Sequence, residues 1–538
     1  MKNIKNILFI LLGVLVITSC NKKIQEYQTN PNNPQSVPPS LILGTVLTDM
    51  SGTGSQGNLG GVDSWGDVHK WNQYFCGNYD YYGNNIYSWT DGSFEPYLVL
   101  KNVAQMESEA TARGAASVNP YAAVGKFVRA YYYYNLTSLF GDVPQVNALQ
   151  GATGNTTPAY TSQKQIFQYV LNTLDSANSN FATLIANNDG SLSASQDIYY
   201  GGNLASWQKL VNTFKLRVLI ALSNKSADAD LNVASQFAKI FNNPTQYPTF
   251  TSQSDDFKFT YVSASYSSYG LTPSNFGSIG TRLNMAATYV SSLTANNDPR
   301  VFITCDPAWK LVDSFKTTAT DYKAFAGAST GEPLSTMYGN ANYGIYSYIN
   351  RYRYFTTFVG EPDVLVGYKE LCFNIAEAIE RGWISGNAET WYKTGINESM
   401  KFYGIDTTQT NFTAHFLPPG NTSAANTVAY PFTFSFSTFY AQPSVMLSSS
   451  SATAINQIVL QKYIAMFQNS GYEGYYNWRR TGVPAFKGGS GVGNNGIVPK
   501  RWEYPVSEQV QNATNYKAAL NAQGFTADDL NQTMWLVK

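Results

Sequence analysis

The sequence predicts a mainly α-helical protein in which helix pairs form a scaffold, joined to a large irregular, loop-rich region with a few short strands. Apolar side chains recur at helical spacing in several separate stretches. Long segments rich in Asn, Ser, Thr, Gly and Tyr lie between these stretches. No alternation of strand and helix patterns runs along the chain, which argues against a doubly wound sheet.

Three one-sided apolar stripes predict helices in the first half of the chain. They lie at about 124–134, 166–184 and 204–221, and each advances by three or four residues. Ser162 and Gln165 precede the second stripe with the spacing of a capping box, which marks a helix start.

A helix hairpin is predicted at 363–403. A stripe from Leu365 to Ile379 stops at Gly382, and a second stripe from Ala388 to Tyr403 follows after a few residues. Small residues at Ala376 and Gly395 would let the two helices approach closely. This pattern is typical of tetratricopeptide units, and another stripe at 455–466 predicts a further helix.

Three long segments, at about 41–90, 244–355 and 405–450, show little helical character. Loops of this length inside a compact body are usually functional. Short alternating runs at 257–261 and 431–436 could be small strands.

The N-terminus has the pattern of an export signal. Lys2 and Lys5 precede an apolar run at 7–17, and small residues lead to Cys20. The run is too short to span a bilayer as a settled helix. Residues 17–20 resemble a lipobox, so we expect residues 1–19 to be removed and Cys20 to be acylated. An ordinary secretory peptide with a chance cysteine is the alternative.

Residues 20–40 are expected to form a flexible tether. They contain few large apolar groups and several prolines, so they cannot build a core of their own. Fully extended, about 20 residues reach at most about 65 Å. Length alone does not decide whether the rest of the chain forms one domain or several.

Composition excludes some partners and favours others. Without Lys2 and Lys5, 33 basic side chains remain against 35 acidic ones, a net charge of −2 that implies neither nucleic acid nor an anionic surface as partner. Aromatic residues make up 15% of the chain and charged residues only 13%. Many rings must therefore lie near the surface, where Tyr and Trp serve in binding.

The sequence predicts neither a disulfide framework nor a metal site. Cys76, Cys305 and Cys372 are few, widely spaced and odd in number, and we interpret them as buried small apolar residues. His69 and His415 have no Cys or carboxylate at ligand spacing. We expect no cofactor.

No motif identifies a catalyst. The run 491–496 matches a dinucleotide fingerprint in its glycines, but no strand precedes it and Pro499 stands where a helix should be, so we interpret it as a flexible loop. Glu370, Glu377 and Glu380 lie on a helix opposite its apolar stripe, which favours solvated or paired carboxylates over catalytic ones. A glycosidase whose carboxylates are far apart in sequence stays possible.

Aromatic residues in the non-helical segments are the better candidates for a ligand site. Sugar rings present C–H faces that pack on aromatic planes, while amide and guanidinium groups bond their hydroxyls. For any single ring, core packing is the alternative, most of all for Trp71 and Trp89. The candidate ligand-binding residues are Trp65, Tyr81, Tyr82, Asn84, Tyr266, Tyr269, Trp309 and Tyr343.

Several stretches together resemble the SusD/RagB-like outer-membrane nutrient-binding lipoproteins of Bacteroidetes. Each motif is short, but their order covers nearly the whole chain. They are YQTNPNNP at 27–34, AYYYY at 130–134 with FGDVP at 140–144, YGGN at 200–203 with WQK at 207–209 and LR at 216–217, DPR at 298–300, AEA at 376–378 with GW at 382–383, QKY at 461–463, WRRTG at 478–482 with Pro484, and RWEYP at 501–505.

The resemblance implies that 41–538 form a single binding domain, with a helical body of four tetratricopeptide-like helix pairs and an irregular region that carries the ligand site. It also implies a partner, a SusC-like TonB-dependent transporter, which such a lipoprotein covers as a lid, and it implies no enzymatic activity. Ligand residues vary within the family, so none is carried over to this chain.

We therefore expect a lipid-anchored protein of the outer membrane, facing the cell exterior, that captures oligosaccharides and delivers them to the transporter. Peptide capture by the same lid mechanism is the second hypothesis. A secreted glycan-cleaving enzyme is the third.

Overall fold

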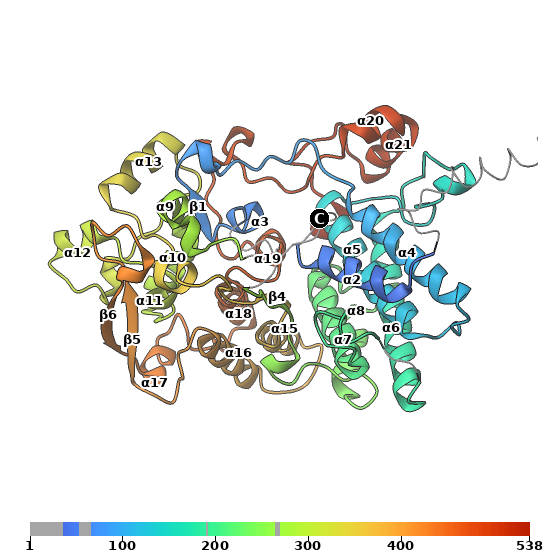
Figure 1. Ribbon diagram of the computed structural model, residues 1–538, viewed down its shortest axis with the longest axis horizontal. Coiled ribbons are helices and arrows are strands. Elements are labelled where there is room, and N and C mark those ends of the chain that lie inside the picture. The colour runs from blue at the N-terminus through green and yellow to red at the C-terminus, as the bar shows by residue number, and fades with distance from the viewer. Residues whose placement is uncertain (1–35, 53–65, 190–191, 264–268) are drawn as a thin grey trace, which may run out of the picture.

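The computed structural model, which describes residues 36–52, 66–189, 192–263 and 269–538, confirms a mainly helical fold with a few short strands (Figure 1). The longer helices are α2 (Pro39–Met50), α4 (Pro96–Ala112), α5 (Pro120–Phe140), α6 (Gln163–Ala186), α7 (Leu204–Ala221), α8 (Val233–Asn242), α13 (Leu334–Tyr343), α15 (Tyr368–Glu380), α16 (Ala388–Phe402), α18 (Ser451–Ala465) and α21 (Ala513–Gln523).

The shorter helices lie mostly in the loop-rich parts. They are α3 (Asp67–Trp71), α9 (Phe276–Ile279), α10 (Ala287–Thr294), α11 (Val301–Thr304), α12 (Trp309–Phe315), α14 (Arg351–Phe355), α17 (Phe436–Tyr440), α19 (Glu473–Thr481) and α20 (Val506–Gln511). The 244–355 region, predicted to have little helical character, thus contains several short helices as well as α13.

The scaffold helices contact each other in pairs, as predicted. α4 packs on α5, α6 on α7, α15 on α16, and α18 on α19, while α5 with α6 and α7 with α15 join neighbouring pairs. In Figure 1 the helices α4 to α8 fill the right half and α15, α16, α18 and α19 the centre.

Side-chain caps explain where several of these helices begin. Ser162 and Gln165 form the predicted capping box at the start of α6. Asn119, Asn203 and Asn387 each accept a backbone N–H of the first turn, of α5, α7 and α16 respectively. All three helical stripes predicted in the first half of the chain are confirmed as α5, α6 and α7.

The α15–α16 hairpin is confirmed, with one correction at its start. Leu365 belongs to the strand β4 (Asp363–Val366) rather than to the helix, which begins at Tyr368. Gly395 lies against the ring of Phe373, where a Cβ atom would come within 2.8 Å of the ring. The small residue therefore sets the close approach of the two helices.

Three two-stranded antiparallel sheets lie in the described residues. β1 (Phe75–Gly77) pairs with β3 (Leu283–Met285), β2 (Phe257–Phe259) with β4, and β5 (Asn411–Phe416) with β6 (Val428–Thr433). The predicted strands at 257–261 and 431–436 correspond to β2 and β6, although α17 already begins at Phe436.

The start of the body differs from the prediction. α2 begins at Pro39, so residues 39–40, expected in the tether, and 41–50, expected to be non-helical, form a helix that packs on α4. Leu43, Val46 and Leu47 of α2 are fully buried. Ser36 donates to Glu109 at 3.0 Å and accepts from Arg113 at 2.8 Å, which holds the chain against α4 before the helix begins.

Two main apolar clusters fill the interior. One lies among α2 and α4 to α8, and the other among α10, α11, α16, α18 and the β5–β6 hairpin. Among the helices of the described residues, none has the length and apolar character that a bilayer crossing requires.

Candidate functional site

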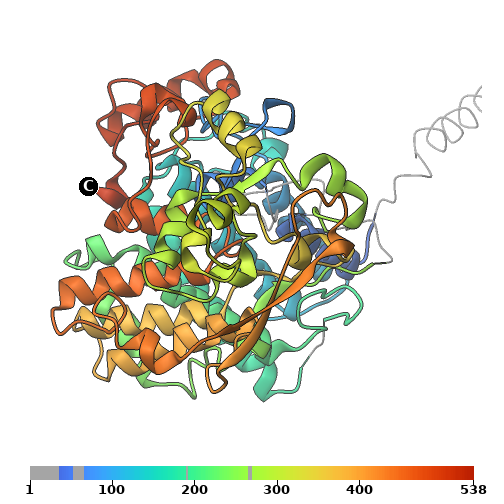
Figure 2. The ribbon, with the colours of Figure 1, turned by 90° about the vertical axis from the view of Figure 1, so that its left-hand side faces the viewer.

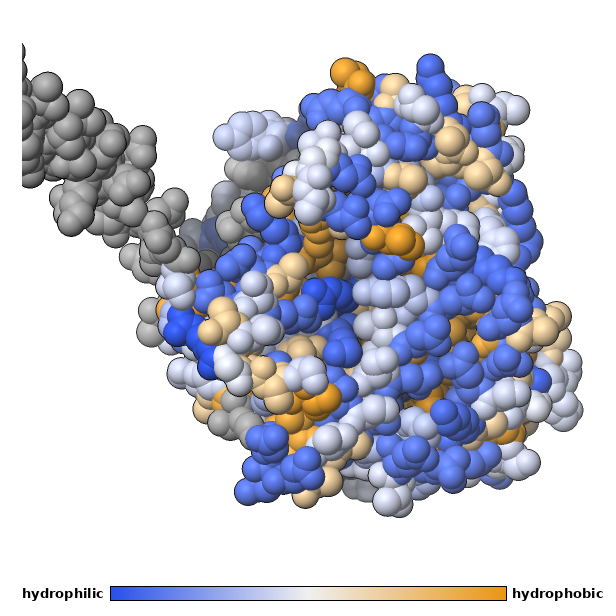
Figure 3. Space-filling model, turned by 90° about the vertical axis from the view of Figure 1, so that its right-hand side faces the viewer, coloured by the Kyte–Doolittle hydropathy of each residue, from blue (hydrophilic) through white to orange (hydrophobic). Residues whose placement is uncertain are grey.

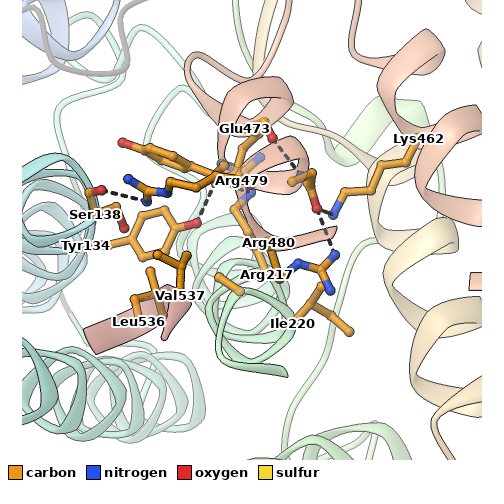
Figure 4. A pocket seen from close by; sticks show the side chains of 13 residues that line it. Tyr134, Ser138, Arg217, Ile220, Lys462, Glu473, Arg479, Arg480, Leu536 and Val537 are labelled. Atoms are coloured by element: carbon orange, nitrogen blue, oxygen red, sulfur yellow. Dashed lines mark hydrogen bonds and ion pairs between the residues drawn. The ribbon is translucent and has the colours of Figure 1, made fainter. Parts of the chain in front are cut away.

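An enclosed cavity lies between the scaffold helices and is too small for a ligand (Figure 4). Its volume is about 10 Å³, room for one water molecule at most. Tyr134, Arg217, Lys462 and Glu473 converge on it from α5, α7, α18 and α19 (Figure 4). Tyr134 donates its hydroxyl to Glu473 at 2.7 Å. This cavity is an interior junction of four helices.

Buried ion pairs surround that cavity. Arg217 donates its Nε to Glu370 at 2.8 Å, and both side chains are almost fully buried. Arg480 donates to Glu377 at 2.9 Å through its second nitrogen, and Arg381 reaches the same carboxylate at 2.9 Å. Burial alone would raise the pKa of Glu377, but Arg480 and then Arg381 lower it to about 2. The carboxylates of Glu370 and Glu377 therefore both form ion pairs with arginines.

The sequence analysis interpreted these glutamates as solvated or paired, and the structure shows ion pairs. Glu370 and Glu377 are paired as expected, but they are buried rather than solvated, since α15 packs against other helices on both sides. Neither reaches the surface, where a substrate would have to meet a catalytic carboxylate.

Exposed aromatic residues gather instead around α13, on the side that Figure 2 turns toward the viewer. Tyr338 of α13 lies with its ring centroid 5.5 Å from that of Tyr79, and the guanidinium of Arg282 lies 4.6 Å from the Tyr79 ring. At the end of α13, Tyr343 is 64% exposed, with Lys310 Nζ 5.0 Å from its ring. We call these five residues the α13 face.

Trp309 extends the α13 face toward the β5–β6 hairpin. It begins α12, donates its indole N–H to the Leu417 carbonyl at 2.9 Å, and lies 6.2 Å from the ring of Tyr430. The backbone N–H of Lys310 donates to Gly344 at 3.2 Å, which ties the start of α12 to the end of α13.

Two grooves continue along the hairpin from there. Their volumes are about 460 and about 300 Å³, and Tyr322 and Thr433 line both. Phe412 and Phe432 line the larger groove and Phe434 the smaller one. The α13 face and the two grooves of the β5–β6 hairpin therefore follow one another along this side of the molecule.

The loops that carry the α13 face are firmly held. Asn85 bonds both the N–H and the carbonyl of Gly77, at 2.9 and 3.0 Å, and approaches the Met337 sulfur of α13 at 3.6 Å. Gly331, three residues before α13, lies backbone to backbone on the loop 488–496, where a Cβ atom would come 1.9 Å from the carbonyl oxygen of Gly488. The segment 491–496, predicted to be a flexible loop, contains 3₁₀ turns at Ser490–Val492 and Asn494–Gly496, and Gly491 packs on the backbone that leads into α13.

The structure brings four of the predicted ligand residues to this region. Tyr81 is 83% exposed, and Tyr343 is exposed at the end of α13. Asn84 bonds Asp80 and the backbone of Ile86 in the same loop as Tyr79 and Tyr81. Trp309 is half-buried at the start of α12.

The burial of Tyr269 argues against its predicted place in a ligand site. Tyr269 is buried, with its ring 5.2 Å from that of Tyr261 and packed against Gly360. Trp65, Tyr266 and Cys20 lie outside the described residues. The backbone of Tyr82 lies in a short 3₁₀ turn at Asp80–Tyr82.

Sequence reasoning missed Tyr338 as a ligand candidate. An aromatic residue inside a helix is usually part of the core, and only the exposure of Tyr338 in the folded structure, beside the exposed Tyr79, shows that this one faces outward. The expected burial of Trp71 and Trp89 is confirmed, since they pack edge to face on each other at 5.4 Å.

The three described cysteines are buried and free, as interpreted from their spacing. Burial raises the pKa of Cys76 and of Cys305 to about 12. His69 is buried, with its pKa lowered by burial to about 3, and His415 stacks on Tyr352 at 4.3 Å. In the part of the chain that the structure describes, no cluster of three His, Cys, Asp or Glu could hold a metal ion.

Comparison with known proteins places this architecture in a family. The model of the SusD-like family, described as "Starch-binding associating with outer membrane", matches residues 31–505. A search of curated proteins gives no significant match.

Solved structures share the fold over almost the whole chain. A SusD homolog from Bacteroides fragilis is 30% identical, with 94% of this chain and 100% of that chain covered and a TM-score of 0.74. A second from the same species is 27% identical, with 93% and 100% covered and a TM-score of 0.77. A chitin-binding SusD homolog from Flavobacterium johnsoniae is 17% identical, with 93% and 98% covered and a TM-score of 0.67, and shares the fold.

The helix-pair scaffold, the loop-rich side and the match over 31–505 agree with one another, and the chain therefore belongs to the SusD-like family of outer-membrane-associated binding proteins.

Proposed function

We propose that this protein captures oligosaccharides at the cell surface, on the α13 face. The observation that carries the proposal is a pair of exposed ring–cation contacts beside one helix, with Arg282 on Tyr79 next to Tyr338 and Lys310 on Tyr343. Aromatic planes bind the C–H faces of sugar rings, and the charged donors bond hydroxyl groups. The family description as starch-binding supports a glycan as ligand.

Delivery to a transporter is the second part of the proposal. The protein hands its ligand to a SusC-like TonB-dependent transporter of the outer membrane and covers it as a lid. The association of the family with the outer membrane supports this location. Acylated Cys20 and the segment after it supply the anchor and the tether, facing the cell exterior.

In this proposal the protein binds the glycan and does not cleave it. Glu370 and Glu377, the clearest carboxylate pair on one helix, are held by arginines in the interior. The α13 face offers rings and cationic donors, which bind a sugar without cleaving it.

A panel of ligands tests the proposal. Calorimetry with purified 20–538 should show binding of at least one soluble oligosaccharide series, with starch fragments tried first. Trp309→Ala should weaken that binding, while Val510→Ala, at an exposed residue of α20, should not.

Two outcomes of the same panel would replace the proposal. Response to peptides but to no glycan would favour peptide capture by the same lid mechanism, since peptides also bind aromatic grooves. Release of reducing sugar during incubation with a polysaccharide would favour an enzyme.

A further inference from the structure

A second cleft lies at the other end of the molecule from the α13 face, between α4, α5 and α6, which stand at the right of Figure 1. Its volume is about 480 Å³. The lining includes Glu107 of α4, Lys126 and Arg129 of α5, and Tyr169 and Thr173 of α6. The right-hand side, shown in Figure 3, is largely hydrophilic.

The charged side chains that line this cleft leave a net positive charge. Arg129 and Glu107 form a two-armed ion pair, with one arm at 2.6 Å, so these two side chains neutralise each other. Lys126 makes no ion pair with any described residue. With the Asn180 amide turned so that its oxygen faces the ammonium, that oxygen accepts a hydrogen bond from Lys126 Nζ at 3.0 Å. One positive charge and two ammonium hydrogens are left for a ligand.

The environment of Lys126 favours an anionic partner. Burial lowers the pKa of Lys126, and the charge of Glu107 opposes that shift only in part. An ammonium that is partly desolvated and forms no ion pair gains from a ligand carboxylate.

The rest of the lining suits a sugar ring. The Thr111 hydroxyl donates to the Glu107 carbonyl at 3.0 Å, and that of Ser176 donates to Asn172 at 3.0 Å. Both oxygens keep lone pairs that can accept sugar hydroxyls. Tyr169 adds a half-buried ring whose inner edge packs on Tyr133 at 5.5 Å.

We propose that this cleft binds an acidic sugar unit, a hexuronate, with its carboxylate on Lys126 and its ring between Tyr169 and the hydroxyls of α4 and α6. The inference rests on the proposed function in taking a glycan as ligand. It adds a second subsite of different chemistry, selective for charge, far from the aromatic face.

Glucuronate and glucose test the proposal, because they differ only in the carboxylate. Ligand-observed NMR titration of 20–538 should show glucuronate binding at least tenfold more tightly than glucose, and added salt should weaken it. Lys126→Met should remove the preference. Lys101→Met, at an exposed lysine of α4 outside the cleft, should leave it unchanged.

Equal binding of the two sugars, or a glucuronate preference that survives Lys126→Met in protein with an unchanged unfolding midpoint, would overturn the proposal. Tyr338→Ala separates the two sites. It should weaken neutral oligosaccharides and leave glucuronate binding intact. A protein that binds neutral oligosaccharides but not glucuronate would contradict the cleft alone and leave the proposed function standing.

Discussion

The buried ion pairs around α15 carry the clearest consequence for single residues. Glu377 accepts hydrogen bonds from Arg480 and Arg381 with no exposure to water. Glu377→Gln leaves both guanidinium groups without an anion, and loss of one partner of a buried pair costs about 3 kcal/mol or more. Urea denaturation should show this loss. Glu380→Gln, on the same helix but partly exposed, should change stability by less than about 0.5 kcal/mol.

The lowered pKa of Glu377 also predicts how the stability of the fold changes in acid. The pKa of Glu377 is about 2 in the folded protein against an ordinary value of 4.5. A depressed pKa stabilises the fold above pH 4.5, and this contribution, roughly 3 kcal/mol, is lost as the pH falls from 4.5 toward 2. The free energy of unfolding of Glu377→Gln should therefore fall less steeply over that range. Parallel slopes for the two proteins would contradict the assignment.

Which aromatic residues face outward could be predicted only in part. Tyr81, Trp309 and Tyr343 lie in or beside loops, and loop position was the signal that found them. Tyr269 has the same local composition but is buried, because the chain folds Gly360 over its ring. The burial of Tyr269 depends on a contact between segments about 90 residues apart in the chain, and a local sequence pattern cannot predict such a contact.

At the scale of helices, the α15–α16 pair depends on one glycine. Gly395→Ala places a methyl group against the Phe373 ring and should destabilise the protein by about 1–3 kcal/mol, because the helices must move apart. Gly339→Ala is the matched control, since Gly339 lies in α13 with open space at its Cβ position. There alanine should stabilise by about 0.5–1 kcal/mol. Thermal unfolding of the two variants should therefore shift in opposite directions.

Helices with a one-sided stripe could be predicted from the sequence, and those without one could not. α6 has a capping box and an apolar face, and both were visible. α2 was missed because Pro38 and Pro39 suggested a tether, whereas proline is well tolerated at the first helical position. β4 was mistaken for helix because the four residues of this strand are all buried and show no alternation.

For the whole molecule, anchoring and binding should be separable. Cys20→Ala removes the acylation site, so the protein should no longer be retained in the outer-membrane fraction. The α13 face is built from residues after position 66, so ligand affinity should be unchanged. Fractionation and calorimetry on the same preparation test both statements. A soluble variant with lost affinity would contradict this division.

The central claim is that the α13 face is the surface that holds the glycan. Calorimetry with a bound oligosaccharide tests it most directly on the double variant Tyr79→Ala and Tyr338→Ala, whose rings are exposed and lie 5.5 Å apart. Loss of this ring pair should cost about 2 kcal/mol, roughly a thirtyfold weaker affinity, with the unfolding midpoint unchanged. An affinity equal to that of the unaltered protein would contradict the account.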